Sequence, residues 1–392
     1  ATTEIYTLSL HDALPIWVFV KNIINHDNLI EIFVETKKKK QICPYCGNIT
    51  SKVHDYRTQR IKDLPIHSTH SIIVLRKRRY VCSCGKKFYE KLTFLPKYHR
   101  MTSRVYASIV KSLKSNYSIK SIAESFNISS TTVIRILKLL NYSCFSLPEV
   151  LCIDEFKGHS GGAKYHCILV DPVNRNVLDI LKDRKTHVLS AYFRNFKDRS
   201  CVRYFVTDMW RPYVDIAKTY FKNATIVIDK YHYTRYNIWA IEGVRKRIQK
   251  SLPHKLRKYF KRSKKLILAR KDSLDDESKK ELEIMLLYSE DLRQAHYIKE
   301  LFYEFTEAKS SVEARELLIK WIKIARSSGI KEYVSCANTL SNWINEIANS
   351  FDVPYTNGCI EGFNNKIKVI KRNAFGFRNF ENFRTRILHC CN

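Results

Sequence analysis

Hydrophobic and polar positions alternate with different periods along the chain and divide it into regions. Residues 17–98 contain strand-like runs with many basic side chains, and residues 100–142 follow a helical period. From 148 to 230, short apolar runs typical of strands alternate with helical patterns. Residues 232–350 form a long, charged helical stretch, and residues 354–392 are mixed. This order predicts several domains.

The region from 148 to 230 contains three strand-like runs, then a helix, a strand, a helix and a strand. That order predicts a mixed α/β sheet with helices on its faces. Asp208 and Asp229 end two of the runs, whereas Asp154 lies inside "VLCIDEF" and is followed by Glu155. Acids at a sheet end can hold Mg²⁺ ions that activate water for phosphodiester cleavage. The alternative is that these residues only terminate strands.

The stretch "YSIKSIAESFNISSTTVIRILKLL" predicts a helix-turn-helix. Ser118 is placed to cap the first helix and Ser129 or Ser130 the second. The second helix would turn three apolar residues inward, namely Val133, Ile136 and Leu137. Its outward face would offer to a DNA groove Thr131, Thr132, Arg135 and Lys138. An ordinary helical hairpin has the same periodicity.

Two pairs of cysteines flank two strand-like runs. Cys43 and Cys46 lie in "ICPYCG", and Cys82 and Cys84 lie in "VCSCG". Two thiolate pairs brought together in this way predict a tetrahedral, structural Zn²⁺ site. The short spacing of the second pair leaves open that one cysteine is replaced by a histidine, from among His54, His67, His70 and His99. Four unrelated thiols are the other alternative.

The composition points to a polyanionic partner. The net charge is +31 and the isoelectric point is about 9.7, which favours binding to nucleic acid. Twelve cysteines without a secretion signal favour a reducing compartment and no disulfide framework. No run of eighteen apolar residues occurs, so we expect no membrane-spanning helix.

The first sixteen residues differ from the rest because they contain no Lys or Arg. One back-translation of Ala1–Ile16 spells a sequencing-library adapter. We therefore expect residues 1–16 to be an assembly artefact, joined to a gene fragment that starts near Trp17.

The last region, "PYTNGCIEGFNNKIKVIKRNAFGFRNFENFRTRIL", predicts a helix that starts at Asn357. On such a helix one face carries Glu361, Asn365, Lys368 and Arg372. A carboxylate beside cationic groups suits a surface that binds phosphate and therefore DNA. An ordinary polar surface helix is the alternative.

Together these motifs resemble the ISL-three family of insertion-sequence transposases. The resemblance runs from about residue 30 to 390 and is most specific in "CIDEF", "VTDMWRPY", "IVIDKYHYTR" and the long C-terminal stretch. It implies a zinc-binding domain, a helix-turn-helix and a ribonuclease-H-like core. The Asp-Asp-Glu triad that it implies is Asp154, Asp208 and Glu361, with Asp229 as a reserve candidate for the second acid.

The resemblance implies a multidomain α/β fold. We expect a β-rich zinc-binding domain at 17–98, a helix-turn-helix at 100–145 and a catalytic domain at 148–392. A helical insertion at about 232–350 would separate the second acid from the third.

It also implies the activity of a DNA transposase. The triad would bind Mg²⁺ (or Mn²⁺), cut at terminal inverted repeats and join the 3′-hydroxyl to target DNA. Because two ends must be brought together, we expect a homo-oligomer, located in the cytoplasm on the bacterial nucleoid. The alternatives are a catalytically silent DNA-binding protein and a metal-dependent nuclease that cuts without joining.

Overall fold

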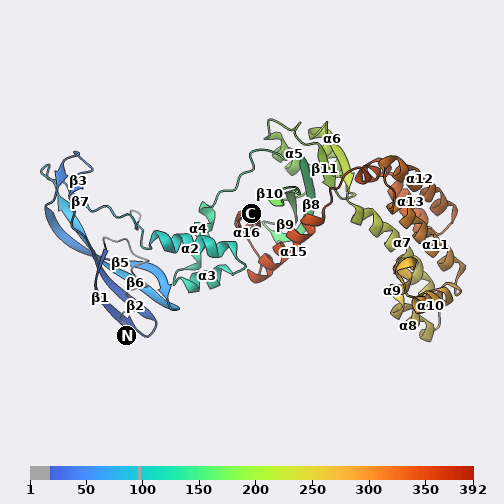
Figure 1. Ribbon diagram of the computed structural model, residues 1–392, viewed down its shortest axis with the longest axis horizontal. Helices are drawn as coiled ribbons and strands as arrows, with labels where there is room; N and C mark the ends of the chain where they lie inside the picture. The colour runs from blue at the N-terminus through green and yellow to red at the C-terminus, as the bar shows by residue number, and fades with distance from the viewer. Residues whose placement is uncertain (1–17, 96–98) are drawn as a thin grey trace. The chain divides into compact units, whose positions relative to one another are not determined.

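The computed structural model describes residues 18–95 and 99–392 (Figure 1). The segment expected to be an adapter, residues 1–16, lies outside the described residues. Contacts divide the chain into two units. The first holds the described residues up to Asn141 together with 369–377 and 381–390. The second holds Tyr142–Lys368, Arg378–Phe380 and Cys391–Asn392. The expected domain boundaries stay a prediction.

An elongated sheet forms the N-terminal part, with strand order β1-β2-β6-β5 and β7 paired to β6. β5 and β6 are antiparallel, and His67 and Ser68 form the turn between them with φ of 46° and 67°. Ile32, Ile61 and Ile73 are fully buried on one side of this sheet. The strands are β1 (Val18–His26), β2 (Leu29–Thr36), β5 (Val53–Ile66), β6 (Thr69–Val81) and β7 (Lys87–Tyr89), with the short pair β3 (Gln41–Ile42) and β4 (Ile49–Thr50) beside them.

The predicted helix-turn-helix is confirmed, with both capping serines in place. The Ser118 hydroxyl accepts a hydrogen bond from the Ser121 N–H at 3.0 Å, and the Ser129 hydroxyl accepts from the Thr132 N–H at 3.2 Å. Asn127 makes the turn with φ of 48°. The predicted inward residues of the second helix are buried, namely Val133, Ile136 and Leu137. The helices are α2 (Ser103–Lys114), α3 (Ile119–Ser125) and α4 (Ser130–Leu139).

A five-stranded sheet with order β10-β9-β8-β11-β12 organises the second unit (Figure 1, green). β8, β9 and β10 form an antiparallel meander, and β11 runs parallel to both β8 and β12. This is the predicted order of three strands, a helix, a strand, a helix and a strand. Its elements are β8 (Val150–Ser160), β9 (Ala163–Asp171), β10 (Asn176–Leu181), α5 (Thr186–Arg194), β11 (Tyr204–Thr207), α6 (Arg211–Tyr220) and β12 (Thr225–Ile228).

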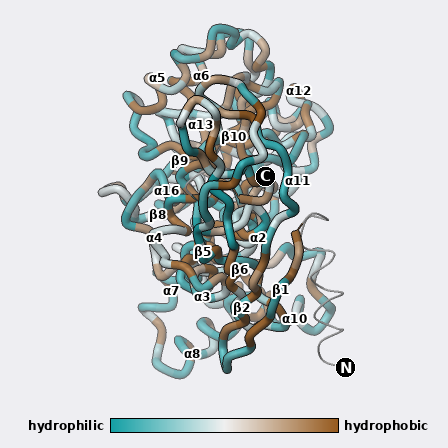
Figure 2. Tube along the Cα trace, turned by 90° about the vertical axis from the view of Figure 1, so that its left-hand side faces the viewer, coloured by the Kyte–Doolittle hydropathy of each residue, from teal (hydrophilic) through white to brown (hydrophobic). Residues whose placement is uncertain are grey.

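The predicted helical insertion is confirmed. It follows β12 and packs around a buried aromatic group in which Trp321 contacts Phe302 and Tyr333 and donates from Nε1 to the Ile298 carbonyl at 2.8 Å. Its helix α8 is strongly hydrophilic (Figure 2, teal). The helices are α7 (Lys230–Ser251), α8 (His254–Arg262), α9 (Lys264–Leu268), α10 (Asp276–Leu286), α11 (Glu290–Thr306), α12 (Ser311–Ser327), α13 (Lys331–Ser341) and α14 (Ile344–Ala348), with short 3₁₀ turns at Lys271–Ser273 and Asn349–Phe351.

Two helices complete the chain, α15 (Gly358–Asn373) and α16 (Phe380–Cys391). α15 begins directly after Asn357, as predicted, and the Asn357 carbonyl accepts from the Ile360 and Glu361 N–H groups. In the first unit, Arg386 of α16 donates to the carbonyls of Ser115 and Tyr117 at the end of α2. Within the described parts of the chain, no helix has the combined length and apolar character that crossing a membrane requires.

Packing inside the five-stranded sheet gives a stability prediction. His166 is fully buried, and its ring nitrogens bond the Ser160 hydroxyl and the Lys182 carbonyl, both at 2.7 Å. A Cβ added at Gly158 would lie 1.8 Å from His166 Cδ2. Gly158→Ala should therefore lower the free energy of unfolding by about 3 kcal/mol, measured by urea titration.

Gly362→Ala is the matched control for this measurement. Gly362 is an exposed position of α15, and a Cβ added there meets no heavy atom within 4 Å. We expect this variant to gain about 0.5–1 kcal/mol from helix propensity. Equal stabilities for the two variants would show that His166 does not hold the position described.

Candidate active site

The end of β11 explains why three acids gather at one place. β11 pairs with β8 only as far as Cys152, so β8 continues beyond its neighbour. Asp154 and Glu155 lie on this continuation, and Asp208 follows directly after β11. The three carboxylates each offer an oxygen, and these oxygens lie within 4.8 Å of one another. The sheet thus brings two of the predicted acids, Asp154 and Asp208, together with Glu155.

Crowding and burial shift the ionisation of this cluster. Burial, with the nearby charges of Glu155 and Asp154, raises the pKa of Asp208 to about 7. Burial, with the charge of Glu155, raises the pKa of Asp154 to about 6. Without a cation the site therefore holds protons near neutral pH, and a divalent cation would favour the ionised carboxylates.

Helix α15 supplies a polar side chain to this cluster. Asn364 donates from Nδ2 to Asp154 Oδ2 at 3.1 Å. The other amide atom, Asn364 Oδ1, is buried and has no hydrogen-bond partner in the protein. Carboxylate and amide oxygens are the ligands that Mg²⁺ prefers, so an amide oxygen without a partner, on a side chain that contacts Asp154, fits a magnesium site and its coordinated water.

Glu155 links the cluster to a basic, aromatic surface. One of its oxygens bonds the Arg184 guanidinium, and the other accepts from the Tyr213 hydroxyl at 3.1 Å. Arg184 in turn lies between two aromatic rings, 4.7 Å from the centre of Tyr165 and 4.8 Å from that of Trp210. Both Glu155 oxygens therefore have partners within the protein.

The structure places Glu361 close to this cluster along α15 but outside it. Glu361 is exposed and lies three residues before Asn364, on a neighbouring position of the same helix. It is absent from the group of acids with oxygens within 4.8 Å among the described residues. The reserve acid, Asp229, is buried and accepts from the Asn357 N–H at 3.1 Å, directly before α15 begins.

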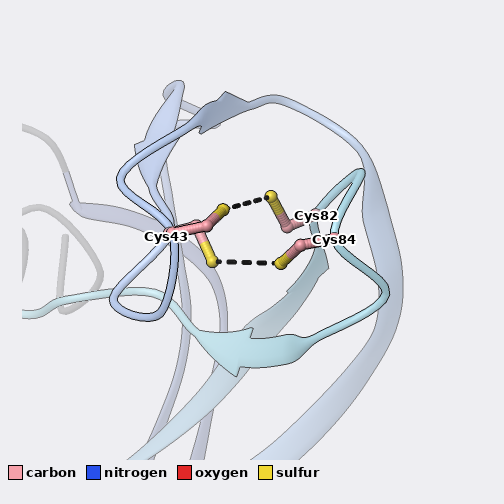
Figure 3. A group of neighbouring side chains, drawn as sticks. Cys43, Cys82 and Cys84 are labelled. Atoms are coloured by element: carbon pink, nitrogen blue, oxygen red, sulfur yellow. Dashed lines mark hydrogen bonds between the residues drawn. The ribbon is translucent and has the colours of Figure 1, made fainter.

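The four predicted cysteines come together at the tip of the N-terminal sheet (Figure 3). Cys43 Sγ lies 3.8 Å from Cys84 Sγ, and Cys46 Sγ lies 3.5 Å from Cys82 Sγ. Tetrahedral zinc with Zn–S bonds of about 2.3 Å places sulfurs about 3.8 Å apart. The arrangement fits structural Zn²⁺.

The predicted DNA-contacting residues are accessible. On α4, Thr131, Arg135 and Lys138 are exposed and Thr132 is half-buried. On α15, Lys368 and Arg372 are exposed, and Lys368 Nζ donates to Asn365 Oδ1 at 3.1 Å. This contact agrees with the predicted helical face.

Sequence reasoning did not assign Glu155 or Asn364 to the site. Adjacent residues of a regular strand point to opposite faces, so the alternation along this run does not predict that Asp154 and Glu155 both lie near Asp208. For Asn364 a signal was present, because it lies one turn after Glu361.

Comparison with known families identifies the chain. Residues 151–387 match a family model described as a transposase, which covers more than half of the sequence. Residues 39–84 match the zinc-finger of transposase IS204/IS1001/IS1096/IS1165, and residues 90–141 match the helix-turn-helix domain of transposase family ISL3. The chain belongs to the ISL3 (ISL-three) family of transposases. As an ISL3 transposase it is a DNA-binding enzyme that cleaves and joins DNA, with a zinc ribbon ahead of its catalytic domain.

This ISL3 transposase is also similar in sequence to two described proteins. The transposase for insertion sequence element IS1001 of Bordetella parapertussis is 27% identical over 371 residues, 91% of this chain and 90% of that protein. A protein described as an ATP-dependent protease of Lactococcus lactis subsp. lactis is 34% identical over 97 residues, 25% of this chain and 30% of that protein. So short a match carries no functional conclusion, and no two glycines here have the spacing of a Walker A loop.

The cysteine cluster predicts a zinc dependence of this ISL3 transposase. Replacing Cys43 and Cys46 together by Ser should remove bound zinc, measured by elemental analysis, and weaken recognition of transposon ends. The matched control is Cys144→Ser with Cys201→Ser, two cysteines outside the cluster, which should keep the zinc. A wild-type protein that purifies without zinc would contradict the site.

The raised pKa values of Asp154 and Asp208 predict a pH dependence of the metal-free protein. Because the folded pKa values lie above the ordinary 3.8, the stabilising contribution is complete below about pH 4 and is lost as the pH rises through 6 and 7. Asp208→Asn removes one ionisation and should raise the free energy of unfolding at pH 8 by about 2–4 kcal/mol.

At pH 5 the same substitution should have a clearly smaller effect, since Asp208 is still protonated in the folded protein and only its ionisation in the unfolded chain contributes. Asp272→Asn, at a side chain 80% exposed, serves as the control and should show no such difference between pH 5 and pH 8. A pH-independent effect of Asp208→Asn would show that the cluster does not titrate in this range.

Proposed function

We propose that this transposase cuts DNA at the terminal inverted repeats of an insertion sequence and joins the freed 3′-hydroxyl to target DNA. The observation that carries the proposal is the meeting of Asp154 and Asp208 at one sheet end, with α15 attached to Asp154 through Asn364. Phosphodiester cleavage and strand transfer need oxygen ligands for divalent cations at a site open to DNA.

The proposed ligands of Mg²⁺ (or Mn²⁺) are Asp154, Asp208 and Glu361. Bound divalent ions would supply an activated water and stabilise the leaving oxygen. Asn364 holds the Asp154 carboxylate in one orientation through its 3.1 Å hydrogen bond. Glu361 is exposed one turn away, which suits a third ligand that also faces the DNA.

The other parts would bind and position the DNA. We assign the structural zinc to Cys43, Cys46, Cys82 and Cys84. We assign contacts to transposon ends to Thr131, Thr132, Arg135 and Lys138 of α4, and backbone contacts to Lys368 and Arg372. Two ends have to be joined in one reaction, so we propose a homo-oligomer acting on the bacterial nucleoid in the cytoplasm.

The rival functions differ from this proposal in their products. A catalytically silent DNA-binding protein would keep zinc and the helix-turn-helix but make no product, and a nuclease would cut without joining. Protein spanning residues 17–392, with Mg²⁺ and the DNA that flanks its gene, should yield both nicked and joined strands. These products should vanish with Asp208→Ala. Binding without any product would favour the silent protein, and cuts without joined strands the nuclease.

Glu361 provides the sharpest test of the proposed ligands. Glu361→Gln keeps the size of the side chain but removes the charge that a divalent cation needs, so it should abolish strand cleavage and leave DNA affinity nearly unchanged. The matched control is Glu381→Gln, an exposed glutamate in the first turn of α16, which should cleave normally. Loss of DNA binding in Glu361→Gln would contradict its role as a metal ligand.

A further inference from the structure

A large hollow lies beside the acidic cluster, at the same end of the five-stranded sheet. Its volume is about 1060 Å³, above the roughly 300 Å³ from which small-molecule sites begin. β8, β10 and β11 end here, antiparallel β9 begins here, and α5 closes one side. The residues that matter in its wall are Lys164, Tyr165, Arg184, Lys185, Arg194 and Trp210.

The wall offers planar groups for stacking. The Arg184 guanidinium lies against the rings of both Tyr165 and Trp210, and Glu155 holds it there. Trp210 is also fixed in position, because its backbone N–H donates to the Asp208 carbonyl at 2.8 Å and its ring packs edge-on against the ring of Tyr213. Aromatic and guanidinium planes of this kind bind bases that have left the duplex stack.

The charge of the wall suits the sugar-phosphate backbone. Arg184 is paired with Glu155, and Lys185 lies 3.4 Å from Asp183. Lys164 and Arg194 add further positive charge, Arg194 while donating to the Tyr220 hydroxyl at 3.2 Å. Their excess over the carboxylates would neutralise phosphates next to a stacked base.

We propose that this hollow binds an unpaired nucleotide of the DNA strand beside the cleavage site. The inference rests on the proposed function for the identity of the strand, since Trp210 lies two residues after Asp208. A paired base inside a duplex presents only its edges, so Tyr165, Arg184 and Trp210 can stack only on a base that is extruded or already single-stranded.

Photo-cross-linking of the full chain tests the proposal directly. The probe is single-stranded oligothymidylate of about twelve nucleotides with one 5-iodouracil, mixed with protein in EDTA so that no cleavage occurs. After irradiation, peptide mass mapping should find the cross-link at Tyr165 or Trp210. Cross-links confined to α4 or α7 would overturn the proposal.

Affinity for the same probe tests stacking. Trp210→Ala should weaken binding roughly 5- to 100-fold, as expected for the loss of one base–aromatic stack, and Trp210→Phe should restore most of it. The matched control is Trp239→Ala on α7, because Trp239 is 50% exposed and also stacks with an arginine, Arg235, at 4.3 Å. Equal losses for Trp210→Ala and Trp239→Ala would contradict a specific pocket.

The cross-linking and strand-joining results together distinguish failure of the nucleotide pocket from failure of the proposed transposition reaction. Protein that cross-links at Tyr165 or Trp210 but never joins strands would contradict the transposition reaction and leave the pocket intact. Protein that cuts and joins DNA yet cross-links elsewhere would contradict the pocket alone. Thermal melting of each Trp210 variant shows whether it is folded, and the wild-type cross-link decides the question without any variant.

Discussion

Repulsion among three carboxylates at the end of β8 is the constraint on which the site depends. Asp154, Glu155 and Asp208 would separate in a flexible chain, because like charges this close repel one another; burial and the charge of Glu155 raise the pKa of both aspartates. The sheet prevents separation, since all three lie on or next to strands fixed by backbone hydrogen bonds. A bound cation would relieve this electrostatic repulsion, so the folded sheet provides metal affinity through the position of its carboxylates.

Two aspartates at the end of the same sheet fix the position of helix α15. Asp229 accepts the N–H of Asn357 just before α15 begins, and Asp154 accepts from Asn364 two turns later. α15 is thus attached to the sheet at two points, although more than a hundred residues of helical insertion separate it from β12. An insertion of this kind is tolerated because the residues at its two ends, Asp229 and Asn357, are joined by a hydrogen bond, so its length need not disturb Glu361.

Much of this organisation could be predicted from local patterns. The exceptions depend on contacts between segments that are far apart in the sequence. The strand and helix order and the Ser118 and Ser129 caps depend on residues close in sequence or on a simple period, and each cysteine pair is recognisable by its own short spacing. Glu155 could not be assigned, because its position depends on where β11 stops pairing with β8.

The basic run "RKRR", Arg76–Arg79, shows the same limit. Four consecutive cations are typical of a surface that binds nucleic acid. Arg78 within the run is nevertheless buried, where it donates to the Thr36 carbonyl and to Glu35 and lies 3.5 Å from Glu90. Its carboxylate partners are distant in sequence, and no local pattern indicates that they meet.

The partners of Glu155 also bear on which acid completes the metal site. Glu155 lies nearest to Asp154 and Asp208, but its oxygens already bond Arg184 and Tyr213. Moving Glu155 onto a cation would leave the Arg184 guanidinium between two rings without its counter-charge, which is costly in a partly buried position. Glu361 bears no such cost, because it is exposed on a helix already attached to Asp154. This difference supports the proposal of Glu361 as the third ligand and leaves Glu155 as the residue that holds Arg184 in place.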